Sequence, residues 1–232
     1  KEMGMTGTSF TNPHGLHNDK HYTTAADMLI LAKTAFEDST IKAITRGKVH
    51  EVQTNKTKHK WYNSNLLLYS NFNELSEDYR VANNLSGTNS VFNGYATSGK
   101  TGYTEEANKC LVFEGEGNDK NMIGIILNAD ETVIFTEASN TINAVVKEYE
   151  LLEWSDPEDK ERVVQVVIGP FGTCLLPCFP AVARHPQLGT SCHPATLAPW
   201  SRFRGAVPVV DIHNGGVHLA VGMGLDPGDV VA

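Results

Sequence analysis

The chain has 232 residues with 19 basic and 27 acidic side chains, giving a formal net charge of −8. Its length allows a hydrophobic core large enough for an enzyme, but its acidic balance argues against nucleic acid as a partner. The sequence contains no run of about 18 apolar residues, the length that would predict a membrane span. Its first ten residues lack the apolar core of a secretory signal. Any membrane contact is therefore expected to come from segments outside this sequence.

The composition changes near residue 156, which predicts two parts. The last lysine is Lys160, and eight of the ten prolines follow it. Closely spaced proline and glycine interrupt long helices and strands. We therefore predict a folded domain at 1–156 and an unassigned tail at 157–232. The tail is expected to be irregular or disordered, and the break in composition leads to the hypothesis that it is a frame-shifted or chimeric segment.

The segment 24–37 is predicted to form an amphipathic helix. Thr24 and Asp27 have the spacing of a capping box, with Asp in place of the usual Glu or Gln. The apolar residues that follow recur at helical spacing, which predicts a face packed on the core. These residues are Ala25, Met28, Leu29, Ala32, Ala35 and Phe36.

Two apolar runs, 109–117 and 121–130, predict an antiparallel hairpin. The residues expected in its turn are Gly115, Gly117, Asn118 and Asp119, which are frequent turn formers. The segment before the hairpin, 97–104, is expected to add an adjacent strand. A long helix is predicted from 131 to 154, with one stripe made by Ile142, Val145, Val146, Tyr149 and Leu152. These elements predict an α+β fold in which helices flank an antiparallel sheet.

The triplet Lys100, Thr101 and Gly102 falls on the predicted added strand. A lysine ammonium attracts a carboxylate, a threonine hydroxyl can donate a hydrogen bond to it, and a glycine leaves room for a ligand beside the strand. The same three residue types are also common in turns. By itself, the triplet is therefore a weak indication of a binding site.

Four segments in one order strengthen this interpretation. They are "NPHGL" at 12–16, "HYTTAADM" at 21–28, the Asn-rich stretch 63–68 and "KTGYT" at 100–104. Together they resemble the D-alanyl-D-alanine carboxypeptidases, which are low-molecular-mass penicillin-binding serine peptidases. The resemblance covers about residues 1–154 and implies the β-lactamase/transpeptidase-like fold, truncated at the N-terminus to the C-terminal part of the catalytic domain.

The resemblance implies removal of the terminal D-alanine from peptidoglycan stem peptides through an acyl-enzyme. It also implies that Lys100, Thr101 and Gly102 bind the substrate, that no cofactor or metal takes part, and that β-lactams bind the full-length protein. The implied location is the extracytoplasmic cell envelope of a bacterium. A β-lactamase-type hydrolase and a catalytically dead peptide-binding module are the alternatives.

The family's other two catalytic motifs have no counterpart at the expected places. No serine has an asparagine two positions later, and the one Ser-x-x-Lys string, Ser39–Lys42, follows the "NPHGL" loop rather than preceding it. We interpret that string as coincidental and assign no catalytic residue. The chain alone is therefore expected to form no acyl-enzyme.

Other candidates have simpler structural interpretations. His14 is expected to hydrogen-bond to backbone, and His17 and His21 do not predict a metal site. Cys110 is expected to be a buried free thiol. A zinc site is a minor alternative because the spacing fits no strong zinc pattern; its candidate ligands are Cys174, Cys178, Cys192, His185 and His193.

Overall fold

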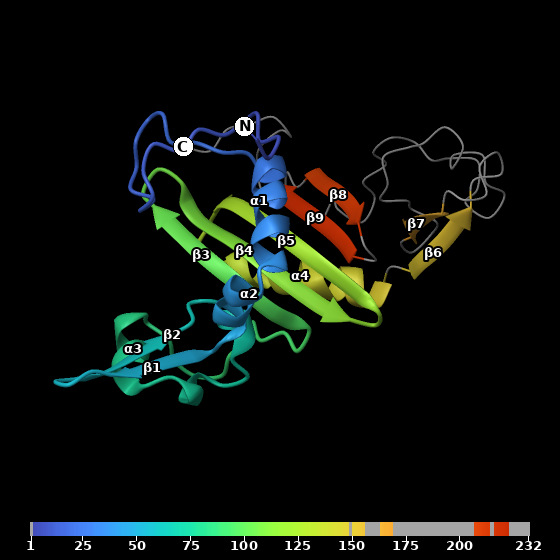
Figure 1. Ribbon diagram of the computed structural model, residues 1–232. Helices are drawn as coiled ribbons and strands as arrows, with labels where there is room; N and C mark the ends of the chain where they lie inside the picture. Colours follow the sequence, from blue (N-terminus) through green and yellow to red (C-terminus); the bar gives the residue numbers. More distant parts are fainter. Residues whose placement is uncertain (1, 149, 156–162, 169–206, 214–215, 223–232) are drawn as a thin grey trace.

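The computed structural model describes residues 2–148, 150–155, 163–168, 207–213 and 216–222. Its main sheet has the strand order β3-β4-β5-β9-β8 (Figure 1). All neighbouring pairs are antiparallel except β5 and β9, which are parallel. The strands are β3 (Ala96–Thr104), β4 (Asn108–Gly117), β5 (Lys120–Ala129), β8 (Val207–His213) and β9 (Gly216–Gly222). The predicted hairpin and its added strand are confirmed.

The turn between β4 and β5 is a two-residue turn. Gly117 pairs with Lys120, and the residues between them, Asn118 and Asp119, have φ values of 52° and 60°. Two successive residues with positive φ match the twist of a tight antiparallel hairpin, and Asn and Asp tolerate this conformation well. Gly115, which was expected in the turn, lies within β4.

Helices cover both faces of the sheet. The helix α1 (Ala25–Glu37) packs on one face through Leu29, Ala32 and Phe36, which meet Ile123, Ile125 and Leu127 of β5. The helix α4 (Ile134–Asn143) packs on the other face, where Leu111, Phe113, Met122 and Ile126 are buried. Alternate residues of β4 and β5 thus serve two cores, and the predicted α+β arrangement is confirmed.

The start of α1 agrees with the sequence except for one contact. Thr24 Oγ1 accepts a hydrogen bond from the backbone N–H of Asp27 at 3.1 Å, as a capping threonine should. The buried Asp27 carboxylate instead accepts from the Gly7 N–H at 2.8 Å and from Thr8 Oγ1 at 2.6 Å. Asp27 therefore attaches the N-terminal segment to the helix.

The long helix predicted for 131–154 is wrong at its C-terminal end. After α4, one π-helical turn, η3 (Ala144–Glu148), precedes the strand β6 (Glu150–Ser155), which pairs with β7 (Val163–Ile168). Apolar residues of a short window fit helical and strand periods equally well, so the pattern alone could not find the change. Ile142, Val145 and Val146 are buried as expected. Tyr149 lies outside the described residues, and Leu152 is in β6.

Strands occupy the described parts of the C-terminal tail. β7, β8 and β9 lie where proline and glycine spacing predicted irregular backbone. Runs such as "VVQVVI" at 163–168 are rich in β-branched residues, which favour strands. The rest of the tail, 157–162, 169–206, 214–215 and 223–232, lies outside the described residues, as do all five zinc candidates. The boundary at 156 stays a prediction.

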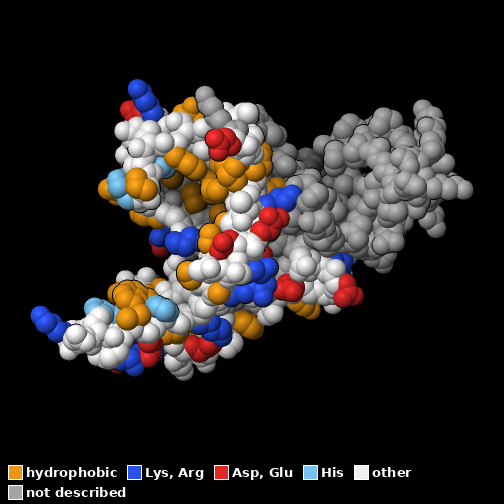
Figure 2. Space-filling view, viewed as in Figure 1, with side chains coloured by type: hydrophobic (Ala, Val, Ile, Leu, Met, Phe, Trp, Pro, Cys, Tyr) orange, Lys and Arg blue, Asp and Glu red, His pale blue; other side chains and the backbone are white. Residues whose placement is uncertain are grey.

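A second group of elements projects from one end of the sheet (Figure 1). Its strands β1 (Val49–Gln53) and β2 (Lys58–Tyr62) form an exposed antiparallel hairpin. Its other elements are α2 (Ser39–Arg46), α3 (Glu77–Ala82) and the 3-10 turns η1 (Leu66–Leu68) and η2 (Phe72–Glu74). Figure 2 shows apolar and histidine side chains gathered on the hairpin, where Trp61 stacks with His50 and His59.

Among the described residues, no helix is long and apolar enough to cross a membrane.

Candidate functional site

The strand β3 carries the predicted binding triplet at the edge of the described sheet. Lys100 pairs with Val112, Thr101 with Leu111 and Gly102 with Cys110. Within the described residues, β3 is hydrogen-bonded to β4 and to no other strand. The outer edge of such a strand offers backbone N–H and C=O groups to an extended peptide.

The three residues of the triplet present different groups at this edge. Lys100 is exposed, and its Nζ donates to the carbonyl oxygen of Thr101 at 2.5 Å. Thr101 is half-buried. Gly102 is exposed, and a Cβ added there would contact only Cys110 Cβ, at 3.7 Å. The triplet therefore combines a cation, a hydroxyl and open space along one stretch of strand.

A loop that the sequence did not connect with the triplet lies against it. Ser64 Oγ is 2.6 Å from Thr101 Oγ1, although the two residues are 37 positions apart. The neighbouring Asn65 is fully buried and donates from Nδ2 to the carbonyl oxygen of Ser98 at 3.2 Å. A Cβ at Gly99 would lie 2.6 Å from Asn65 Nδ2, so this approach requires glycine. We call Asn63–Asn65 the Asn-Ser-Asn clip.

The clip is held by hydrogen bonds at both of its ends. Asn63 donates from Nδ2 to the carbonyl oxygens of Thr45 at 2.9 Å and Gly47 at 3.0 Å. Asn63 Oδ1 accepts from the Asn65 N–H at 2.9 Å, and Asn65 Oδ1 accepts from the Leu67 N–H at 3.2 Å. Asn residues often hydrogen-bond to backbone two positions on, so the Asn-x-Asn spacing was the signal that could have indicated this loop.

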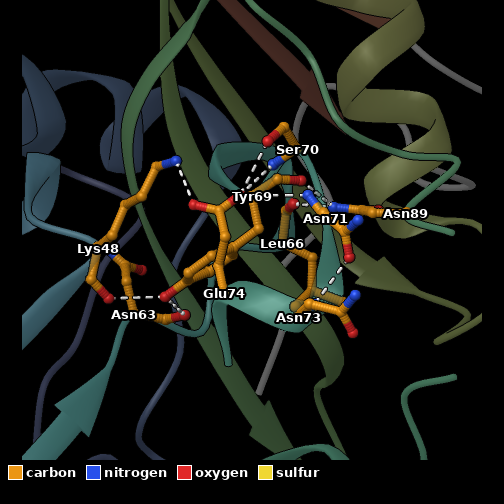
Figure 3. Close-up of polar contacts among 9 residues, drawn as sticks. All are labelled: Lys48, Asn63, Leu66, Tyr69, Ser70, Asn71, Asn73, Glu74 and Asn89. Carbon is orange, nitrogen blue, oxygen red and sulfur yellow. Dashed lines mark hydrogen bonds and ion pairs between the residues drawn. The ribbon is translucent and has the colours of Figure 1, made fainter. Parts of the chain in front are cut away.

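Figure 3 shows the hydrogen-bond network that joins Asn63 of the clip to the residues around Tyr69 and Glu74. The hydroxyl of the buried Tyr69 lies 2.7 Å from the carbonyl oxygen of Lys48 and 2.9 Å from that of Asn63, and these two acceptors share its one hydrogen. Burial raises the pKa of the Tyr69 hydroxyl well above its usual range, so it remains a donor. Glu74 accepts from Lys48 Nζ at 2.8 Å and from the Ser70 and Asn71 backbone. The network thus joins the clip to η2.

The ion pair of Glu74 predicts a measurable loss of stability in acid. The hydrogen bond from Lys48 is the main reason that the pKa of Glu74 falls to about 2. Because this folded-state pKa lies below the unfolded value, the stabilisation is complete above about pH 4.5 and is lost as the pH falls toward 2. Glu74→Gln should therefore remove about 1 kcal/mol of this acid-dependent stability, a value reduced for solvent screening.

The measurement is the free energy of unfolding by urea at pH 6 and pH 3. The difference between the two values should shrink in Glu74→Gln and, to a smaller extent, in Lys48→Met, where Ser70 and Asn71 still donate to Glu74. Adding Lys48→Met to Glu74→Gln should have little further effect. An unchanged difference in both variants would show that this pair does not contribute to the acid sensitivity.

The Ser39–Lys42 string does not have the arrangement of a catalytic serine and lysine. Ser39 is the exposed first residue of α2, which is capped by Asp38. Lys42 Nζ lies 3.5 Å from Glu114 Oε1, and the buried Glu114 also accepts from Ser98 Oγ at 2.6 Å. Lys42 therefore balances the charge of a buried carboxylate of β4, which pairs with β3 at Ser98.

The "NPHGL" loop is a hydrogen-bonded turn. Asn12 Oδ1 accepts from the Gly15 N–H at 2.8 Å, and His14 Nδ1 accepts from the Leu16 N–H at 3.1 Å. This backbone contact is the one expected of His14. His17 Nδ1 lies 3.7 Å from Glu106 Oε2, in the turn that follows β3. The loop therefore lies beside the end of the triplet's strand.

Cys110 is the one candidate cysteine that lies within the described residues. Cys110 is a half-buried free thiol, and burial raises its pKa, which makes it a poor nucleophile at neutral pH. In the part of the chain that the structure describes, no cluster of three His, Cys, Asp or Glu side chains could hold a metal ion.

Sequence comparison identifies relatives of this chain. Residues 1–76 match the sequence model of the family described as D-alanyl-D-alanine carboxypeptidase. The chain is 31% identical over 129 residues to the D-alanyl-D-alanine carboxypeptidase DacF of Bacillus subtilis (strain 168). It is 28% identical over 131 residues to the D-alanyl-D-alanine carboxypeptidase of Streptomyces sp. (strain K15). The resemblance to the D-alanyl-D-alanine carboxypeptidases is confirmed.

The similarity covers only part of each protein. It takes in 56% of this chain and 28% of the Bacillus carboxypeptidase, and 54% of this chain and 38% of the Streptomyces carboxypeptidase. The chain therefore spans well under half the length of the carboxypeptidases that it matches. The Asn-Ser-Asn clip and the Lys-Thr-Gly triplet both lie within residues 1–154, the part of the chain that contains the four segments resembling the family.

Comparison with solved structures finds partial matches. The S96A mutant of the Streptomyces K15 DD-transpeptidase is 23% identical to this chain, with a TM-score of 0.47. The match covers 61% of this chain and 49% of the transpeptidase chain. A D-alanyl-D-alanine carboxypeptidase from Mycobacterium tuberculosis H37Rv is 23% identical and covers 50% of this chain and 37% of its own, with a TM-score of 0.37.

Proposed function

We propose that this chain is part of a serine-type D-Ala-D-Ala carboxypeptidase and that β3 docks the end of its peptide substrate. The observation that supports this role most directly is the edge position of Lys100, Thr101 and Gly102, with a cation, a hydroxyl and open space in register. A peptide carboxylate carries one negative charge and accepts several hydrogen bonds, which these groups can supply.

The reaction in this proposal is acyl transfer. A serine oxygen attacks the carbonyl carbon between the last two D-alanines, its proton passes to the leaving amine, and D-alanine departs. Water then adds to the acyl-enzyme ester, which releases the shortened peptide and restores the serine. We assign the serine to no residue of this chain and assign only docking to β3. The substrate would be a peptidoglycan stem, with β-lactams as competing acylating ligands, in the bacterial cell envelope.

A peptide-binding module without catalysis is the second candidate. It is favoured by the placement of Ser39, which is exposed at the start of α2, and of Lys42, which lies against Glu114. In this candidate, the Lys-Thr-Gly triplet on β3 is the only one of the family's three catalytic motifs that has a role. Both candidates require β3 to recognise a terminal carboxylate.

Titration of the labelled chain with acetyl-Lys-D-Ala-D-Ala tests this docking. We expect the amide signals of residues 98–104 to shift with millimolar affinity. The same peptide with a C-terminal amide should bind about tenfold more weakly, because the charge facing Lys100 is gone. The measurement is a two-dimensional NMR titration with both peptides. Equal affinity for the two peptides, or shifts confined to other strands, would refute the docking role.

A further inference from the structure

We propose that Ser64 is a positioning residue for Thr101. The Ser64 hydroxyl donates to Thr101 Oγ1, which leaves the Thr101 hydroxyl hydrogen free to point at a carboxylate docked on β3. This inference rests on the proposed function. It adds a residue outside the Lys-Thr-Gly triplet to the machinery that recognises the ligand.

The first observation is the contact itself. Ser64 Oγ and Thr101 Oγ1 are 2.6 Å apart, which is short for a hydrogen bond between two hydroxyls. Both side chains are half-buried, so each retains a solvent-facing side. The distance allows either oxygen to be the donor, and the proton arrangement therefore depends on what else the two hydroxyls contact.

The second observation is that Ser64 has little freedom to move away. It is the middle residue of the Asn-Ser-Asn clip, whose two asparagine side chains make hydrogen bonds to backbone on either side of it. Asn65 is fully buried against β3, and Gly99 is the residue that permits this approach. The position of the Ser64 hydroxyl is therefore set by the hydrogen bonds of both neighbouring asparagines, of which those made by Asn65 are buried.

The number of hydroxyl hydrogens decides which of the two residues donates to the other when an anion binds. Each hydroxyl has one hydrogen and two acceptor lone pairs. If Thr101 donates to Ser64, its lone pairs face the carboxylate and repel it. If Ser64 donates to Thr101, the Thr101 hydrogen is available and is polarised by the bond that its oxygen accepts. A docked carboxylate thus favours the second arrangement, in which Ser64 orients the Thr101 hydroxyl and polarises its hydrogen.

Ser64→Ala tests the proposal by removing the donor while keeping the clip. We expect about five- to tenfold weaker binding of acetyl-Lys-D-Ala-D-Ala and no change for the peptide with a C-terminal amide. We expect Ser64→Thr to restore the affinity. Ser86→Ala, which changes an exposed serine elsewhere, is the matched control. A second readout, independent of the ligand, is the χ1 rotamer of Thr101 from three-bond couplings, which should be single in the unaltered chain and averaged in Ser64→Ala.

A double-mutant cycle separates this proposal from the function on which it rests. Thr101→Val should weaken carboxylate binding, and adding Ser64→Ala to it should have almost no further effect. If the unaltered chain fails to distinguish the two peptides, the docking function is wrong and the inference is overturned with it. If the chain does distinguish them, but Ser64→Ala keeps its affinity and its Thr101 rotamer, the inference alone is overturned.

A folding defect would not leave the question open. If Ser64→Ala loses its dispersed NMR spectrum, Ser64→Cys takes its place, because a thiol is similar in size and a weak donor. The same loss of carboxylate affinity is expected for Ser64→Cys, and full affinity in that folded variant would contradict the proposal.

Discussion

Gly124→Ala should destabilise the protein by about 3 kcal/mol, near the upper end of the usual cost of overpacking a core. Gly124 pairs across the strands with Phe113, and a Cβ added at Gly124 would overlap the Phe113 ring. Phe113 is fully buried in the core beneath α4 and cannot swing into solvent. Urea unfolding followed by circular dichroism measures the change in free energy.

Two variants control this result. Gly102→Ala, in the same sheet, places its Cβ 3.7 Å from Cys110 Cβ, an ordinary van der Waals contact, and should change stability by less than about 0.5 kcal/mol. Phe113→Leu in the Gly124→Ala background should recover part of the loss, because it removes the overlapping ring atoms. Equal stability of the two alanine variants would mean that the ring does not pack over Gly124 as described.

Lys100→Ala should weaken binding of acetyl-Lys-D-Ala-D-Ala about 10- to 100-fold. A hydrogen bond to a charged group contributes about 1.5–3 kcal/mol, and each 1.4 kcal/mol corresponds to a tenfold change in affinity. The fold should be unaffected because the Lys100 side chain is exposed. The dissociation constant from NMR titration is the measured quantity.

The controls distinguish a local contact from a general effect of charge. Lys58→Ala removes one positive charge from the exposed hairpin, where Lys58 pairs with Glu51 at 2.7 Å, and should leave the affinity unchanged. Lys100→Arg keeps the charge with a different geometry and should bind with intermediate affinity. Identical affinities for Lys100→Ala and the unaltered chain would contradict carboxylate docking at β3.

Local patterns predicted the elements whose signals lie within a few residues of each other. Thr24 begins α1 as its cap, and the Asn118-Asp119 turn joins β4 to β5. A capping threonine and a two-residue turn act on backbone groups two or three positions away, so one sequence is enough to recognise them.

The same reasoning failed where two periods were possible. The apolar residues after Val146 were assigned to the predicted long helix, yet Glu150–Ser155 forms β6 and pairs with β7. The choice between helix and strand there depends on a pairing partner, which a local pattern does not contain. Domain boundaries and the binding role of the triplet stay predictions.

The sequence by itself determined the family resemblance, the helix start at Thr24, the hairpin and the strand that carries Lys100. Only the tertiary structure decided that Ser64 meets Thr101, that Lys42 meets Glu114, and that the Phe113 ring lies over Gly124. These contacts join segments tens of residues apart in most cases, and their geometry depends on how the sheet and its flanking helices pack. A single sequence records which side chains are available, whereas packing determines which of them meet.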